Sequence, residues 1–193
     1  MTGFIKQLLV QHFCDHENIL SAALRADMQR RGGYNADNPN SLQIEALERW
    51  MQGQRSESRP ALLIKSHAWE YSRVGIGDMS GGNAMTGETT YFGTCQGSHT
   101  VFALAEHGGE ALNLATEVFK IGLWYNSLIC QQLNLLRFLP VNIGEIADVK
   151  ESKENYVVPV SFAYVVPEEW GLQPDAPRLK QFVFRASATI PDY

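Results

Sequence analysis

The segment from Tyr156 to Val166 constrains the fold most, because large apolar side chains occupy every second position along it. The residues of this one parity are Tyr156, Val158, Val160, Phe162, Tyr164 and Val166. Such alternation predicts a β-strand with one apolar face. Pro159, on the other parity, cannot donate to a β-ladder, which places the strand at a sheet edge or a bulge. An edge strand can pair with another copy of the chain, so the segment is predicted to form a subunit contact.

Apolar spacing along the rest of the chain predicts both helices and strands. Helix is expected over 4–31, in two pieces with Asp15 as a cap, over 41–51, and over 110–135 as one long, broadly apolar helix. Strands are expected over 60–77, 89–105, 137–146 and 178–186, with a loop over 168–177 and a projecting, flexible glycine-rich loop over 78–88. Gly122, inside the long helix, indicates a close backbone approach.

This element order predicts an α+β fold. Strands that follow one another without intervening helices favour a mostly antiparallel sheet, with the long helix packed across one face and a helical region at the N-terminus. We expect a single domain over 1–193, made of a helical region over 1–55 and a sheet-plus-helix core over 60–190.

Composition excludes some classes of protein. The net charge of -5 argues against a broad nucleic-acid or anionic-lipid footprint. Cys14, Cys95 and Cys130 are odd in number and irregularly spaced, so we expect reduced, buried thiols rather than a disulfide framework. The sequence lacks a secretory signal and an apolar window of about 18 residues, so no membrane association is expected.

The residue types that carry chemistry occur in weak patterns. Cys95, His99 and His107 could serve a small cysteine- or metal-dependent hydrolase, but their spacing is not that of an established metal or nucleophile motif. His12 and His16 lie four apart and fit a surface or interface pair better than a metal chelate.

Three residues of the 60–77 segment fall on one strand face. They are Trp69, Tyr71 and Arg73. This face could stack on a base or a sugar, but an aromatic strand face more often belongs to a core or a subunit contact.

The layout resembles the tail terminator and neck proteins of tailed bacteriophages. The segments that carry the resemblance are 60–74, 89–105, the helix over 110–135, and ENYVVPVSFAYVVP around the 156–166 strand. The 41–51 region and the 168–193 tail are longer than a minimal member needs. The resemblance implies a non-enzymatic virion protein without cofactor or metal, located in the virion and in the host cytoplasm during assembly.

The resemblance also implies partners. Copies would form a hexameric ring, as tail terminators do, with the twelvefold ring of some connectors as the alternative, and DNA would pass through the lumen without sequence-specific binding. The 156–166 strand would contact the neighbouring subunit. The loop over 78–88, with Met79, Asn83 and Met85, would become ordered against connector or tail-tube proteins. A small hydrolase and a generic adaptor module are the alternative functions.

Overall fold

The computed structural model describes residues 1–31, 34–35, 41–47, 60–73, 79–83, 86–148 and 156–172. The chain separates into two compact units. The first comprises Met1–Tyr71 and Cys95–Pro167, and the second comprises Ser72–Thr94 and Glu168–Tyr193. The expected final strand over 178–186 lies outside the described residues.

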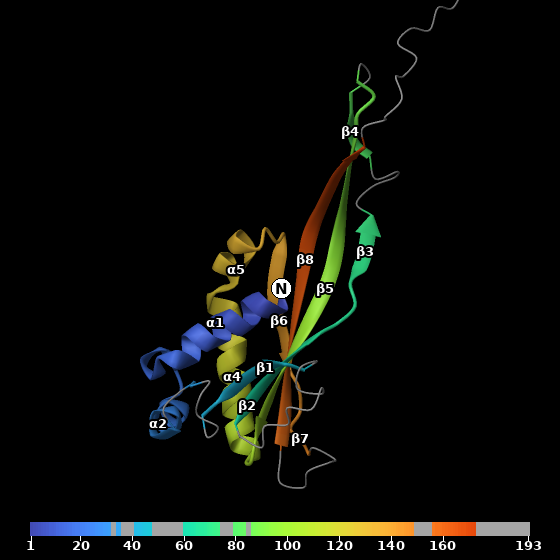
Figure 1. Ribbon diagram of the computed structural model, residues 1–193. Helices are drawn as coiled ribbons and strands as arrows, with labels where there is room; N and C mark the ends of the chain where they lie inside the picture. Colours follow the sequence, from blue (N-terminus) through green and yellow to red (C-terminus); the bar gives the residue numbers. More distant parts are fainter. Residues whose placement is uncertain are drawn as a thin grey trace, which may run out of the picture. The chain divides into compact units, whose positions relative to one another are not determined.

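The described elements confirm the α+β class (Figure 1). The helices are α1 (Thr2–Cys14), the short 3-10 helix η1 (His16–Asn18), α2 (Ala22–Arg31), α4 (Gly108–Trp124) and α5 (Asn126–Gln132). The strands are β1 (Gln43–Ala46), β2 (Ala61–Ser66), β3 (Glu70–Arg73), β4 (Met79–Gly82), β5 (Thr89–Ala105), β6 (Arg137–Ile143), β7 (Ala147–Asp148) and β8 (Tyr156–Leu172). The sheet has the order β1-β2-β5-β8-β6, with β3 and β4 paired to β5 and β7 paired to β8.

In the first unit, α1, α2, α4 and α5 all lie on one side of the sheet (Figure 1). Their apolar stripes pack on the inward parity of the strands and form a single large core cluster. Gly122 of α4 lies directly over β8, where a Cβ atom would come within 2.5 Å of the Phe162 ring. The predicted close approach at this glycine is therefore present.

The strand expected over 156–166 forms with the predicted parity, but the prediction that it lies at an edge is wrong. β8 runs between β5 and β6 in the interior of the sheet. The proline is tolerated because the Pro159 carbonyl accepts a hydrogen bond from Gly144 N at 2.7 Å, just beyond the end of β6. In an antiparallel hydrogen-bonded pair, the backbone N–H and C=O of one residue face the same neighbouring strand. The backbone nitrogen of Pro159, which carries no hydrogen, therefore faces the gap between β6 and β7. β8 also continues to Leu172, where the start of a loop was expected.

The helix expected over 41–51 is wrong at its start, because Gln43–Ala46 forms β1, which pairs with β2 in parallel. Leu42 and Ile44 are both buried and alternate with the half-buried Gln43 and Glu45. This short period-two pattern was masked in the sequence by Leu47, which also fits a helical stripe.

The long helix expected over 110–135 is instead two helices that meet at Tyr125. Asn126 begins α5, and its side-chain amide donates to the Phe138 carbonyl at 2.6 Å. Asparagine is a poor residue for a helix interior because its side chain competes for backbone hydrogen bonds. Here it bonds to β6, at the point where the helix breaks. The two-piece helix at the N-terminus is confirmed, with the Asp15 carboxylate accepting from Glu17 N between α1 and η1.

In the second unit, the described part of the 78–88 segment is a hairpin rather than an open loop. β4 pairs antiparallel with β5, with Gly82 opposite Thr89. Asn83 N donates to Glu88 O at 2.8 Å, and Gly87 adopts a positive φ of 75°, which glycine reaches without strain. The stacked rings of Tyr91 and Trp170, 5.7 Å apart, join β5 to β8 in this unit.

Candidate functional site

The apolar face of β8 lies inside the first unit's own core. Val158 and Val160 are fully buried, and Phe162 and Tyr164 are 4% and 2% exposed. Tyr156, which is half-buried, packs against the same cluster. These five residues, expected at a subunit contact, present no free apolar surface to a second chain in this fold.

Exposed apolar side chains lie instead around the neighbouring edge strand, β6. Val141 is 60% exposed and Leu136, just before the strand, is 58% exposed. A groove of about 270 Å³ runs over the sheet at this place, lined among others by Arg137, Leu139, Val141 and Val165. In the described part of the chain, no helix lies over this groove, since all those of the first unit pack on the other side of β6 and β8 (Figure 1).

The outer edge of β6 is poorly suited to accept another strand. The Phe138 carbonyl already accepts from Asn126, Pro140 has no N–H, and the register against β8 shifts at Val141. Proline and bulges are common protection for sheet edges. Side-chain packing on the uncovered sheet face is therefore the contact that this edge favours.

The three residues expected on one strand face do not share a strand. Trp69 lies in the connection between β2 and β3 and is 52% exposed, while Tyr71 in β3 is 44% exposed. The Trp69 ring makes an edge contact with the Tyr164 ring, with 6.1 Å between centroids. Arg73 ends β3.

The expected loop residues fall in and around the hairpin of the second unit. Met79 begins β4 opposite Tyr91, and the exposed Asn83 begins the turn, where its side chain accepts from Thr86 N at 3.4 Å. Met85 lies outside the described residues.

A polar cluster surrounds His99 on β5, which is 1% exposed. Its Nε2 lies 2.9 Å from Thr2 Oγ1, and its ring is 5.3 Å from that of Tyr164. Burial, helped by the positive N-terminus and by His67, lowers the pKa of His99 to about 4. Burial likewise raises the pKa of Tyr164. A neutral, hydrogen-bonded His99 is a core residue that ties α1 to the sheet.

The second buried polar pair joins α1 to α4. His12 Nε2 lies 3.0 Å from Glu117 Oε1, which also accepts from Leu20 N at 2.8 Å, and both side chains are almost fully buried. Burial raises the pKa of Glu117, but the hydrogen bonds from His12 and from the Leu20 amide outweigh it and bring the pKa below its ordinary value. The sequence pairing of His12 with His16 missed this contact, because the partner is 105 residues away.

The structure does not gather the residues of the hydrolase alternative into a site. Cys95 and His99 are four residues apart on β5, a distance of about 13 Å along a strand. His107 lies beyond the end of that strand and is exposed. Among the residues that the structure describes, no group of three His, Cys, Asp or Glu side chains could hold a metal ion.

The cysteines differ from expectation in burial. Cys14 is exposed, and Cys95 and Cys130 are half-buried, so the prediction of three buried thiols is wrong. All three are free, as expected.

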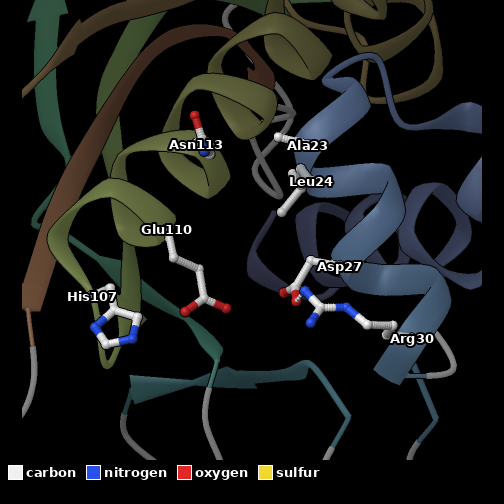
Figure 2. Close-up of a pocket in the computed structure, with 7 residues that line it drawn as sticks. All are labelled: Ala23, Leu24, Asp27, Arg30, His107, Glu110 and Asn113. Carbon is white, nitrogen blue, oxygen red and sulfur yellow. Dashed lines mark hydrogen bonds and ion pairs between the residues drawn. The ribbon is translucent and has the colours of Figure 1, made fainter.

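A polar depression of about 390 Å³ lies between α2 and the start of α4 (Figure 2). Arg30 Nη2 and Asp27 Oδ1 form an ion pair at 2.6 Å, on the side of the depression opposite His107 and Glu110. The Arg30 side chain is 78% exposed, so this pair is open to solvent and contributes little to stability.

Two sequence comparisons with known proteins found no match. The chain matches no protein-family profile, and no curated protein resembles it in sequence. In the described part of the chain, no helix is long and apolar enough to span a membrane.

Proposed function

We propose that this chain is a structural protein of the tailed-phage neck, where copies assemble into a ring that terminates the tail tube or joins it to the head connector. The observation that carries the proposal is the apolar sheet face at β6, which no described helix covers and where Val141 is 60% exposed beside the half-buried Leu139. Exposed apolar side chains gathered around a groove are typical of protein–protein contacts.

The order of elements supports the phage assignment over a generic adaptor. Helices at the N-terminus, paired strands, the α4–α5 helices and then two paired strands follow the layout of tail terminators and neck proteins. The ring is sixfold in this proposal, with twelvefold order as the alternative. A net charge of -5 suits a ring through which DNA passes without being gripped.

In this ring, the β6 face of one subunit packs on a different surface of the next, because a head-to-tail contact is what closes a ring. The protected edge of β6 rules strand addition out of the proposed contact. Leu139, Val141 and Val165 are its apolar centre, with Arg137 exposed beside them.

Val141→Lys tests the proposal. A lysine at the centre of a packed apolar contact carries an uncompensated charge, so ring formation is lost. The matched control is Leu20→Lys, which places the same charge at a 37% exposed leucine between η1 and α2. Light scattering and negative-stain imaging of wild-type and variant proteins, together with immunodetection in purified phage particles, provide the readout.

The proposal predicts closed rings, free or in particles, for the wild type and for Leu20→Lys, and none for Val141→Lys. Wild-type chain that forms no ring and is absent from particles would refute it, as would rings unaffected by Val141→Lys.

A further inference from the structure

Helix α4 carries a second apolar stripe next to its core-facing side, and Phe119 of this stripe also packs against the core cluster. Leu112 and Leu123 on this stripe are 40% and 49% exposed, and Thr116 and Phe119 between them are half-buried. The side chains that bury α4 in the core, such as Leu114, Val118 and Ile121, lie on a different face of the helix. A soluble helix normally presents polar residues in the place of such a stripe.

The spacing of the stripe is that of a helix–helix seam. Leu112, Thr116, Phe119 and Leu123 follow one another at intervals of four, three and four, which matches alternating a and d positions of a heptad. The same intervals read identically in both directions. The stripe is therefore complementary to itself when two copies run antiparallel.

We infer that a second copy of this chain occupies the stripe, in an antiparallel two-fold pairing of α4 with α4. In this register Leu112 packs against Leu123 of the partner subunit, and Thr116 packs against Phe119 of the partner subunit. A two-fold contact of this kind is isologous, so each leucine pair occurs twice. It does not close a ring, and it is independent of the β6 contact proposed above.

The polar groups of the stripe are compatible with burial in this contact. Thr116 Oγ1 donates to the Leu112 carbonyl at 2.8 Å within α4, so its hydroxyl needs no partner across the interface. Lys120 is the one charged residue beside the stripe on this side of α4, and its long side chain reaches solvent from the rim. Antiparallel pairing offsets the two Lys120 residues by about 7 Å along the helix axis, whereas parallel pairing would set them level.

The contact is small, which sets its strength. The seam from Leu112 to Leu123 is about 17 Å long, shorter than a standard stable interface requires. A reversible dimer with a dissociation constant on the order of micromolar is therefore expected.

Cysteine crosslinking of the full-length chain tests the register. In a Cys14→Ser background, Leu112→Cys and Leu123→Cys proteins are prepared separately, one with a size tag, and oxidised alone or mixed. In the antiparallel pair, the two 112 positions lie about 17 Å apart along the axis, so neither variant alone can form a disulfide across the seam. The mixture brings position 112 opposite position 123 and is expected to yield a heterodimer. Gln131→Cys, an exposed position of α5, is the control and is expected to give none.

Charge substitutions give a second readout. Leu112→Glu and Leu123→Lys are each expected to weaken self-association about tenfold or more, by burying an unpaired charge. Mixing the two variants pairs glutamate with lysine and is expected to restore the dimer in sedimentation velocity. Preferential crosslinking of Leu112→Cys with itself would overturn the antiparallel register. A wild type that stays monomeric at about 100 μM, well above the expected constant, would overturn the pairing itself.

Discussion

The buried contact between His12 and Glu117 makes the sharpest prediction about stability. Glu117 is 1% exposed, and one of its oxygens accepts from both His12 Nε2 and Leu20 N. Glu117→Ala removes the acceptor and leaves both donors buried without it. An orphaned buried donor costs about 1–3 kcal/mol. Since two donors lose their acceptor, we expect the variant to lose about 2–5 kcal/mol of unfolding free energy.

Urea denaturation at pH 7, followed by far-ultraviolet circular dichroism, measures this loss. Glu117→Gln keeps a carbonyl acceptor of nearly the same shape and should lose less than Glu117→Ala. Glu106→Ala, at an exposed carboxylate just before α4, is the control and should change stability by less than about 0.5 kcal/mol. A loss below about 1 kcal/mol for Glu117→Ala would refute the assignment of this contact as a structural link between α1 and α4.

The pH dependence has a definite sign. The pKa of Glu117 is lower in the folded chain than its ordinary value of 4.5. Its unfolded form therefore binds protons first on acidification, so its contribution is fully present above about pH 4.5 and declines as the pH falls towards the folded pKa. Wild-type protein should lose stability over this acidic range more steeply than Glu117→Gln.

Three further predictions follow from close contacts and burial. Gly122→Ala gains helix propensity but places a Cβ 2.5 Å from the Phe162 ring, so a net loss of about 1–3 kcal/mol is expected in thermal unfolding; an increase in stability would contradict the packing. His99, with its pKa lowered to about 4, should show imidazole resonances that stay constant between pH 8 and 6 and shift only near pH 4; because the pKa is lowered on folding, its contribution to stability is complete above pH 6.5 and declines towards pH 4. Asn126→Ala frees the Phe138 carbonyl at the outer edge of β6 and should lower the free energy of unfolding by about 1 kcal/mol. The variant should also aggregate more in light scattering. Unchanged aggregation would show that the edge is protected without the Asn126 side chain.

The sequence predicted the α+β class because its longest patterns report which side chains are buried. Alternation from Tyr156 to Tyr164 places four fully or nearly fully buried side chains on one face of β8. Pro159 led to the wrong prediction that β8 is an edge strand. A proline shows that the strand lacks one N–H donor, but it does not show which side of the strand lacks it. That side depends on where β6 ends, which is a property of the tertiary structure.

The sequence did not predict elements that span only a few residues or that depend on contacts between distant parts of the chain. The alternation at Leu42 and Ile44 spans too few residues to compete with a helical stripe. The break at Tyr125 depends on a hydrogen bond from Asn126 to a strand twelve residues later. The breadth of the apolar surface on the long helix indicated either a central place in the domain or a covering partner. The core accounts for most of this surface, and Leu112 and Leu123 remain exposed.

The sequence indicated β8 as the contact surface, whereas the candidate surface in the structure is β6. This difference also depends on tertiary structure. Val141 has no distinctive sequence context, and its exposure arises from the register shift between Pro140 and Asn142. A bulge of one residue cannot be located from the pattern of a seven-residue strand.

Assembly through the uncovered β6 face is the central claim, and the mass of the particles formed by wild-type and Val141→Lys proteins tests it most directly. Native mass spectrometry of each, alone and on purified neck or tail particles, should find a closed ring for the wild type and for Leu20→Lys, and unassembled chain for Val141→Lys. Rings of the same mass for Val141→Lys would contradict the claim, as would a wild type that assembles neither alone nor on particles.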